Sequence, residues 1–222
     1  MSAANLSKQR VLIVDDHPVV RRGLAELIAS DPNLEVCGEA SSAAEALDLV
    51  AAAQPHLAVI DLSLKDGHGL ELIEEIKARF EHVKMLVSSV HDESLFAERA
   101  LRAGAMGYVN KQEATETMIL AIHQIARGEV YLSDTMANRL LRSVVSGDSL
   151  SEDPVKRLSN RELEVFEMIG RGLTTKQISQ RLHLSPKTIE SHREKIKVKL
   201  NLFNGTELSH HAMQWVMQAR SG

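Results

Sequence analysis

Three aspartates directly follow short apolar runs in the N-terminal third of the chain. Asp15 and Asp16 end the run VLIVDD, and Asp61 ends HLAVID. If these runs are neighbouring strands of a parallel sheet, their carboxylates project into one crevice at the carboxyl ends of the strands. Carboxylates so close together raise one another's proton affinity unless a cation is bound, and Mg²⁺ prefers such oxygen ligands. The pattern predicts a divalent-cation pocket, although a single acid after a strand is more often a turn or capping residue.

The pocket requires a parallel sheet, and the sequence up to about residue 127 has the pattern of one. Short apolar runs alternate with amphipathic segments five times, which indicates five strand–helix units. Uninterrupted apolar strands between helices are typical of a parallel sheet that is covered on both faces and has right-handed crossovers. The predicted class is α/β, with a five-stranded, doubly wound parallel sheet over residues 10–127. The expected strands begin at Val11, Leu34, His56, Val83 and Gly107.

The alternation stops at Gly128, and a different organisation follows. Residues 128–153 contain one further helical segment and a stretch rich in Ser, Asp and Glu, which predicts a connecting helix and a linker. Beyond the linker every periodic segment is helical, with helix-start signals at Ser159, Ser185 and Asn204. Residues 154–219 are therefore expected to form a second, smaller all-α domain. Two of its helices are separated by a short turn at 183–185, which is the spacing of a helix-turn-helix.

Composition and charge limit the class of protein. The chain has a net charge of −4, but residues 1–150 carry 22 acids against 14 Lys and Arg, whereas residues 151–222 carry 8 against 12. This asymmetry suggests that the C-terminal part meets an anionic partner. No apolar run reaches the roughly 20 residues of a membrane span, and the single cysteine, Cys37, excludes an internal disulfide. A cytoplasmic protein without a membrane partner is expected.

The N-terminal motifs resemble those of the receiver domains of two-component response regulators. The similar stretches are VLIVDDHPVVRRGL, LAVIDLSLKDGHGLEL, MLVSSVHDE and GAMGYVNKQE, in this order over about residues 10–127. The resemblance implies a flavodoxin-like receiver fold in which Asp61 is the phosphoacceptor and attacks a phosphorylated histidine of a sensor histidine kinase. It also implies Mg²⁺ bound directly by Asp16 and through water by Asp15, with Asp61 and the backbone carbonyl of Ser63 as further ligands.

The same resemblance assigns the residues around the phosphoryl group. Lys111 would neutralise one phosphoryl oxygen, Ser89 would hydrogen-bond another, and Tyr108 would be the rotating aromatic residue of the switch. Ser88 also carries a hydroxyl group, and strand alternation allows only one of the two serines to face the pocket. Taken alone, Lys111 is more typical of a solvated lysine at a strand end, and Tyr108 is more typical of a core aromatic residue. Their order among the other motifs favours the functional roles.

The C-terminal helices resemble the LuxR-type DNA-binding domain, so the whole chain resembles the NarL/FixJ family of regulators. The stretch LSNRELEVFEMIGRGLTTKQISQRLHLSPKTIESHREKIKVKLNL carries this resemblance. It implies that the helix over residues 186–200 enters the major groove of double-stranded DNA and that the last helix pairs two subunits. The implied homodimer forms on phosphorylation and binds an inverted repeat. The expected DNA-binding residues are Lys176, Lys187, Thr188, Glu190, Ser191, Glu194 and Lys195, and the expected dimerisation residues are Leu208, Ala212 and Trp215.

Two acids lie on the predicted DNA face of this recognition helix. Helical periodicity places Ile189 and Ile196 on the packing face and Glu190 and Glu194 on the opposite face. Phosphates repel acids at such a position. The two glutamates either read cytosine amino groups or orient neighbouring Lys and Ser side chains, and the sequence leaves both possibilities open.

Two other functions are alternatives to a regulator. An aspartyl-nucleophile phosphotransferase or phosphatase of the haloacid-dehalogenase type has Asp-x-Asp after its first strand, whereas Asp15 and Asp16 are adjacent. The sequence also has no sizeable cap insertion that would bind a substrate. The third possibility, a DNA-binding module that is never phosphorylated, would not need the set Asp15, Asp16, Asp61 and Lys111. The expected function is a phosphorylation-controlled transcription regulator that is not itself an enzyme.

Overall fold

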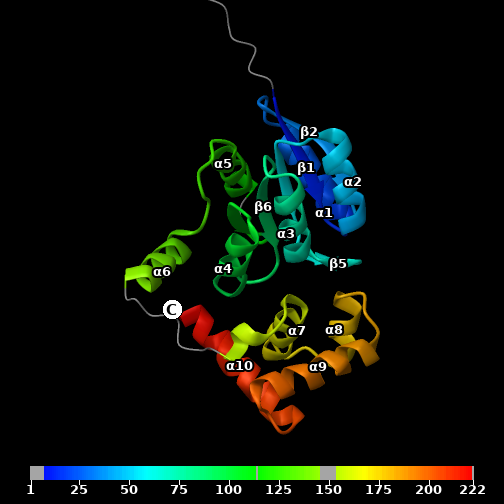
Figure 1. Ribbon diagram of the computed structural model, residues 1–222, viewed down its shortest axis with the longest axis vertical. Coiled ribbons are helices and arrows are strands. Elements are labelled where there is room, and N and C mark those ends of the chain that lie inside the picture. The colour runs from blue at the N-terminus through cyan, green and yellow to red at the C-terminus, as the bar shows by residue number, and fades with distance from the viewer. Residues whose placement is uncertain (1–7, 114, 146–153, 222) are drawn as a thin grey trace, which may run out of the picture. The chain divides into compact units, whose positions relative to one another are not determined.

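The computed structural model describes residues 8–113, 115–145 and 154–221. The chain forms two compact units, which divide between Met136 and Ala137 (Figure 1). This division falls inside the segment 128–153 that is predicted to connect two domains, and the linker predicted after the connecting helix lies largely at 146–153, outside the described residues. Among the residues that are described, no helix is long and apolar enough to cross a lipid bilayer.

Within residues 8–113, five strands form one parallel sheet. They are β1 (Gln9–Val14), β2 (Leu34–Ala40), β3 (Leu57–Ile60), β6 (Lys84–Ser89) and β7 (Gly107–Asn110), in the spatial order β2-β1-β3-β6-β7. The strands in the middle of the sheet are apolar and buried because helices cover both faces. The predicted α/β class and doubly wound parallel sheet are confirmed, and β1 lies beside β3, so the two acid-bearing strand ends are neighbours.

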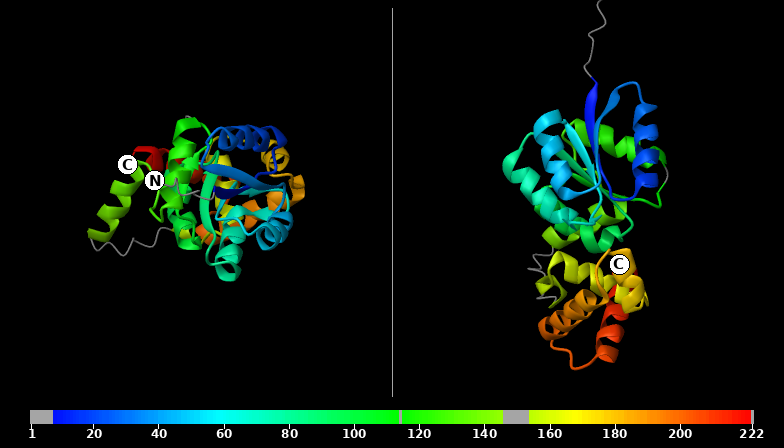
Figure 2. Two further views of the ribbon diagram at one scale, coloured as in Figure 1. Left: turned by 90° about the horizontal axis from the view of Figure 1, so that it is seen from above. Right: turned by 90° about the vertical axis from the view of Figure 1, so that its right-hand side faces the viewer.

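Helices α1 (Pro18–Ala29) and α5 (Thr115–Ala126) lie on one face of the sheet. Helices α2 (Ala43–Ala53), α3 (Gly69–Arg79) and α4 (Glu93–Ala103) lie side by side on the other (Figure 2). The α1–α5 side contains an apolar core that includes Val11, Ile28, Val59, Ile122 and Ile125. Two of these helices begin at a short polar side chain: Ser42 caps α2 and Asp92 caps α4 by accepting backbone N–H hydrogen bonds.

A small hairpin that the sequence pattern does not predict follows β3. Its strands are β4 (Ser63–Leu64) and β5 (Gly67–His68), which pair antiparallel. Between them, Asp66 accepts hydrogen bonds from the N–H groups of Ala43 and Ala44, at 2.8 and 3.1 Å, and so ties the hairpin to the start of α2. A Cβ on Gly69 would lie 2.7 Å from Leu62 Cα. Only glycine therefore allows the chain to fold back so closely on the segment that carries Asp61.

The rest of the described chain is helical. Helix α6 (Asp134–Val145) lies in the predicted connecting segment. Within residues 154–221, a short 3-10 helix η1 (Pro154–Arg157) precedes α7 (Asn160–Gly170), α8 (Thr175–Arg181), α9 (Pro186–Leu200) and α10 (Gly205–Ser221). The predicted capping box of Ser159 and Glu162 starts α7, and Ser185 caps α9. The prediction of a small all-α domain with a helix-turn-helix, α8 and α9, is confirmed.

The prediction that Leu208 and Ala212 pair two subunits is wrong. Both side chains are fully buried inside their own domain, where α10 packs against α7. Trp215 is partly buried on the same side of α10, with its ring 5.5 Å from that of Phe166. The apolar periodicity of α10 correctly indicates a packing face, but periodicity alone does not distinguish a face that covers its own domain from one that covers a second copy.

Gly170→Ala is expected to destabilise the helical domain. A Cβ at residue 170 would lie 2.7 Å from Val216 Cγ2 and would press on the carbonyl group of Ala212, so α7 and α10 would have to separate. Overpacking of this kind costs about 1–3 kcal/mol of unfolding free energy. Gly23→Ala, in α1, is the matched control because a Cβ there meets no atom within 4 Å, and it should stabilise the other unit by up to about 1 kcal/mol.

Urea denaturation measures both effects. Circular dichroism follows all helices, and the fluorescence of Trp215 follows the unit that contains α7 and α10. A Gly170→Ala variant as stable as the wild type would contradict the close packing of α10 on α7.

Candidate functional site

The three aspartates predicted to form a pocket lie together at the carboxyl ends of β1 and β3. Asp15, Asp16 and Asp61 are exposed by only 1%, 3% and 3%, respectively. One ligand atom from each of them and one from His17 lie within 4.8 Å of one another. The strand order brings these carboxylates together although Asp61 follows Asp15 by 46 residues in the chain.

Lys111 supplies the counter-charge that burial of these carboxylates requires. Its Nζ donates hydrogen bonds to Asp15 Oδ2 and to Asp61 Oδ2, each at 2.6 Å, and its side chain is 11% exposed. The backbone N–H of Lys111 also donates to the carbonyl group of Ser89 at 2.8 Å, which continues the β6–β7 pairing beyond β7. One buried cation is therefore shared by two carboxylates that come from different strands.

One lysine does not balance three carboxylates, and the acidity of Asp61 reflects this. Burial raises the pKa of Asp61 to about 6, Lys111 opposes this shift, and the negative charge of Asp15 adds to it. Burial alone would lower the pKa of Lys111, but the carboxylates of Asp61 and Asp15 outweigh burial and raise it. Asp61 Oδ1 is buried and has no hydrogen-bond partner within the part of the chain that the structure describes. A buried carboxylate oxygen of this kind is a suitable ligand for a hard cation.

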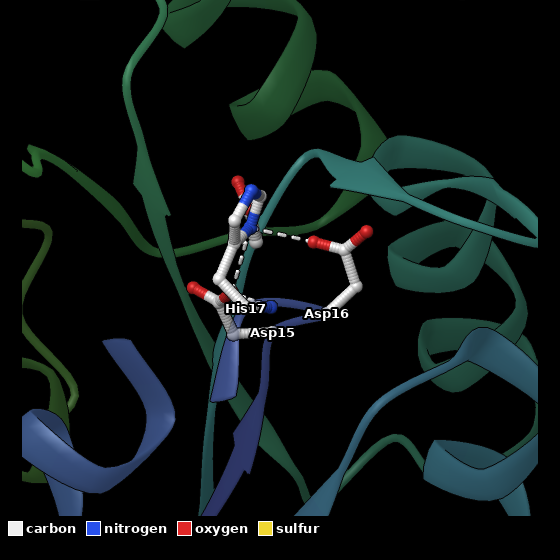
Figure 3. A group of neighbouring side chains, drawn as sticks. Asp15, Asp16 and His17 are labelled. Carbon is white, nitrogen blue, oxygen red and sulfur yellow. Dashed lines mark hydrogen bonds and ion pairs between the residues drawn. The ribbon is translucent and has the colours of Figure 1, made fainter. Parts of the chain in front are cut away.

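His17 belongs to this cluster although sequence analysis did not single it out. Its Nδ1 lies 2.7 Å from Asp16 Oδ1 and 3.3 Å from Asp15 Oδ1, and its side chain is 55% exposed (Figure 3). The signal in the sequence is its place immediately after the paired acids, in DDH. His17 is the exposed member of the cluster, whereas the three aspartates are buried.

Sequence analysis also missed His91, which is buried and forms hydrogen bonds with the predicted switch residues. Ser89 Oγ accepts a hydrogen bond from the His91 N–H at 3.2 Å, and Tyr108 Oη donates to the His91 carbonyl oxygen at 2.9 Å. The His91 Nε2 lies 3.1 Å from Ser63 Oγ, so the ring reaches the loop after Asp61. Asn110 Nδ2 also donates to the His91 carbonyl, at 3.2 Å. The loop between β6 and α4 is thus bonded both to the segment that follows Asp61 and to β7.

The choice between Ser88 and Ser89 can be examined by strand register. Ser89 pairs with Asn110 and Val87 with Tyr108, so Ser89 shares a sheet face with the aromatic residue. Ser88 pairs with Val109 on the opposite face, and its Oγ has no partner among the described residues. Ser89 makes its hydrogen bond with His91, and neither serine is bonded to Asp61 here.

The recognition helix α9 presents the predicted polar face. Ile189, Ile196 and Leu200 are buried, and Thr188 is partly buried with its Oγ1 2.8 Å from the capping Ser185 Oγ. Lys176 in α8 is exposed. The exposed residues of α9 include Lys187, Glu190, Ser191, Glu194, Lys195 and Val198.

Both acids on this face have partners inside the domain. Glu190 Oε1 accepts a hydrogen bond from Thr175 Oγ1 at 2.7 Å, which joins α9 to the first residue of α8. Glu190 Oε2 lies 3.6 Å from Arg193 Nε, and Glu194 Oε1 lies 2.9 Å from Lys197 Nζ. These contacts favour the second sequence-based possibility, in which the acids orient neighbouring groups, although the groups are a threonine, an arginine and a lysine of the same domain.

Comparison with known families supports both halves of this description. Residues 11–123 match the family described as response regulator receiver domain. Residues 156–212 match the family described as bacterial regulatory proteins, luxR family. The two matched segments correspond to the α/β unit and to the helix-turn-helix unit.

Individual relatives match across nearly the whole chain. The DNA-binding transcriptional activator DevR/DosR of Mycobacterium tuberculosis is 36% identical over 200 residues, which cover 89% of this chain and 91% of the relative. The nitrate/nitrite response regulator protein NarL of Escherichia coli is 31% identical over 217 residues, which cover 98% of this chain and 99% of the relative. The structure of RcsB from Salmonella enterica bound to promoter rprA has a TM-score of 0.61 at 25% identity and covers 93% of this chain and 99% of RcsB. The chain therefore belongs to the NarL/FixJ family of response regulators, which join a receiver domain to a LuxR-type domain.

Proposed function

We propose that this response regulator is a DNA-binding transcription regulator that is switched by phosphoryl transfer to Asp61. The observation that carries the proposal is the buried cluster in which Lys111 holds one carboxylate oxygen of Asp61 while the other has no hydrogen-bond partner among the described residues. Family membership supports a sensor histidine kinase as the donor.

In the proposed transfer, a carboxylate oxygen of Asp61 attacks the phosphorus of a phosphohistidine on the kinase. The P–N bond breaks, and the imidazole leaves with the electron pair of that bond and takes up a proton. Asp61 must be ionised to attack. Burial raises its pKa to about 6 even though the positive charge of Lys111 opposes the shift, so the carboxylate form still predominates at neutral pH. The same ammonium group stabilises negative charge on the transferred phosphoryl group.

A magnesium ion fits the remaining charge of the pocket. Asp16 and Asp61 would ligate it directly, Asp15 through water, and Ser63 through its backbone carbonyl. When bound, Mg²⁺ would neutralise phosphoryl oxygens during transfer. Asp15 and Asp61 would at the same time keep their hydrogen bonds to Lys111, which orient their carboxylates.

The output is proposed to be DNA binding by α9. Its exposed face would enter the major groove, where Ser191 and Lys195 reach base edges and Lys187 and Lys176 contact phosphates. Phosphorylation would favour a homodimer on an inverted repeat, with Ser89 and Tyr108 responding to the phosphoryl group. RcsB is described as bound to a promoter, which supports this output. The present chain is proposed to act in the cytoplasm. Leu208 and Ala212 take no part in the proposed dimer contact, because they are buried.

The two alternatives are less well supported. The relatives are described as response regulators or transcriptional activators, which does not favour a phosphatase of the haloacid-dehalogenase type. A receiver that is never phosphorylated would have no need of a buried Asp61 whose second oxygen is unpartnered.

Asp61→Asn is expected to abolish covalent labelling by a small phosphodonor such as acetyl phosphate, because an amide is not a nucleophile for phosphorus. Labelling of the wild type should also fall to background in a chelator and return when Mg²⁺ is added. Asp48→Asn, on the exposed side of α2, is the matched control and should label like the wild type. Radiolabel incorporation measures all three, and full labelling of Asp61→Asn or of the chelated wild type would contradict the pocket assignment.

Thr175→Val and Glu190→Ala are expected to weaken DNA binding without changing the preferred sequence. Each removes the same hydrogen bond between α8 and α9, so their effects should not add, and the coupling should exceed about 0.5 kcal/mol of binding free energy. Thr175→Ser keeps the hydroxyl group and should bind like the wild type.

Selection from a random DNA pool and a salt titration of affinity test this expectation. Lys187→Ala is the comparison variant, because loss of a phosphate contact should weaken binding to all sequences and reduce the salt dependence by about one counterion. If Glu190→Ala changes the selected sequence while Thr175→Val does not, Glu190 reads a base instead.

A further inference from the structure

The chain that leaves the α/β unit first runs along the open edge of its sheet. β7 is the last strand in the spatial order, and the segment 129–133 lies beside it. The Tyr131 N–H donates to the Met106 carbonyl at 2.9 Å, and the Tyr108 N–H donates to the Tyr131 carbonyl at 3.1 Å. The side-chain amide of Gln124 also donates to the Val130 carbonyl at 2.7 Å. The segment between α5 and α6, drawn in green in Figure 1, is therefore held to β7 by backbone hydrogen bonds.

This close approach depends on a glycine in β7. A Cβ on Gly107 would lie 2.7 Å from the Tyr131 carbonyl oxygen and 2.9 Å from Ile125 Cδ1. Any larger residue at this position would move Tyr131 away from the strand that carries Tyr108.

The start of α6 is bonded to the start of α4. Glu93 is the first residue of α4, and its Oε1 accepts a hydrogen bond from the Ser133 N–H at 3.0 Å. Ser133 Oγ in turn accepts from the Met136 N–H at 3.2 Å, one turn into α6. A single residue, Ser133, thus connects α4 to the helix that continues toward the DNA-binding domain.

The loop that precedes α4 connects the start of this helix to the pocket. The loop between β6 and α4 is short, and His91 is bonded to Ser89, Tyr108 and Asn110. Asp92 caps α4 immediately before Glu93. A continuous series of hydrogen bonds and short chain segments therefore runs from Ser89 through His91 and Glu93 to Ser133.

We propose that Glu93 and Tyr131 form a tether, together with Ser133, that conveys the phosphorylation state of the pocket to α6. This inference rests on the proposed function, because it presupposes a phosphoryl group on Asp61. That group would offer the Ser89 hydroxyl new acceptors, and a turn of the hydroxyl toward them would remove the acceptor of the His91 N–H. The loop that carries His91 would then shift, and the first turn of α4 with Glu93 would move away from Ser133.

The tether differs from an output through the buried isoleucines of α5. Ile122 and Ile125 are fully buried in the core, so a change at their surface cannot be read by another molecule. The tether instead acts on the chain itself, at the point where it continues toward the second domain. The backbone hydrogen bonds of Tyr131 cannot be removed by a side-chain substitution, whereas the acceptor that Glu93 offers to Ser133 can.

Glu93→Ala in the full-length protein tests the tether. The variant should be labelled by acetyl phosphate like the wild type, but its DNA affinity should no longer respond to labelling. Couplings of this kind are typically about 5- to 150-fold in affinity, so the ratio of affinities with and without phosphorylation should fall to about 1. Glu93→Gln keeps a carbonyl acceptor for the Ser133 N–H and should retain the wild-type ratio. Glu98→Ala, on the same helix and ion-paired with Arg102, is the matched control.

Hydrogen exchange of the Tyr131 amide reports on the tether directly. In the wild type this amide should exchange slowly and become faster on phosphorylation, whereas in Glu93→Ala it should be fast in both states. Gly107→Ala acts at the other end of the tether and should also lower the affinity ratio.

Two outcomes separate this inference from the proposed function. Absence of labelling in the wild type would overturn the assignment of Asp61 and the tether with it. Normal labelling of Glu93→Ala with a wild-type affinity ratio, or unchanged exchange of the wild-type Tyr131 amide on phosphorylation, would overturn the tether alone.

Discussion

The buried ammonium group of Lys111 is the interaction on which the pocket depends. Its Nζ lies 2.6 Å from Asp15 Oδ2 and 2.6 Å from Asp61 Oδ2, and these two aspartates follow different strands. Without this cation the two carboxylates would be buried with no compensating charge. A buried ion pair is stable only when its geometry is close and its remaining hydrogen-bonding groups are satisfied. In this pocket the negative charge is only partly balanced, because Lys111 carries one positive charge and the cluster contains three acids. The remaining negative charge and the unpartnered oxygen of Asp61 make the pocket receptive to a cation and a phosphoryl group.

The surrounding fold connects this pocket to the rest of the chain through short loops. β6 and β7 end beside the pocket. The backbone N–H of His91 donates a hydrogen bond to Ser89, and its carbonyl oxygen accepts hydrogen bonds from Tyr108 and Asn110. A small change in charge at Asp61 can therefore alter the start of α4 without altering the apolar core. In the helical domain, the two exposed acids of the recognition helix each lie beside a cation, Glu190 beside Arg193 and Glu194 beside Lys197, which would reduce their repulsion of DNA phosphates.

The sequence predicts the features that follow from periodicity and from the ends of strands. Alternating apolar runs predict the five parallel strands, and strand ends predict the meeting of Asp15, Asp16 and Asp61. The place of Lys111 beside them was implied only by the resemblance to receiver domains. The hairpin β4–β5 and the pairing of Tyr131 with Gly107 are not predictable in this way, because each involves only one or two residues per strand. His91 was missed because its hydrogen bonds to Ser89, Tyr108 and Asn110 are made by its backbone N–H and carbonyl groups, which have no signature in the sequence. The error over Leu208 and Ala212 arose because an apolar helix face looks the same whether it covers its own domain or a partner.

The titration of the Asp61 carboxyl group, followed by NMR in the metal-free protein, tests the central role of Lys111 most directly. We expect a midpoint near pH 6 in the wild type, because burial raises the pKa of Asp61 to about 6 against the opposing charge of Lys111. In Lys111→Met the loss of the cation disfavours the ionised carboxylate, so the midpoint should rise further. A wild-type midpoint near the ordinary value of 3.8, or an unchanged or lower midpoint in Lys111→Met, would contradict the claim that burial and Lys111 together set the pKa of Asp61.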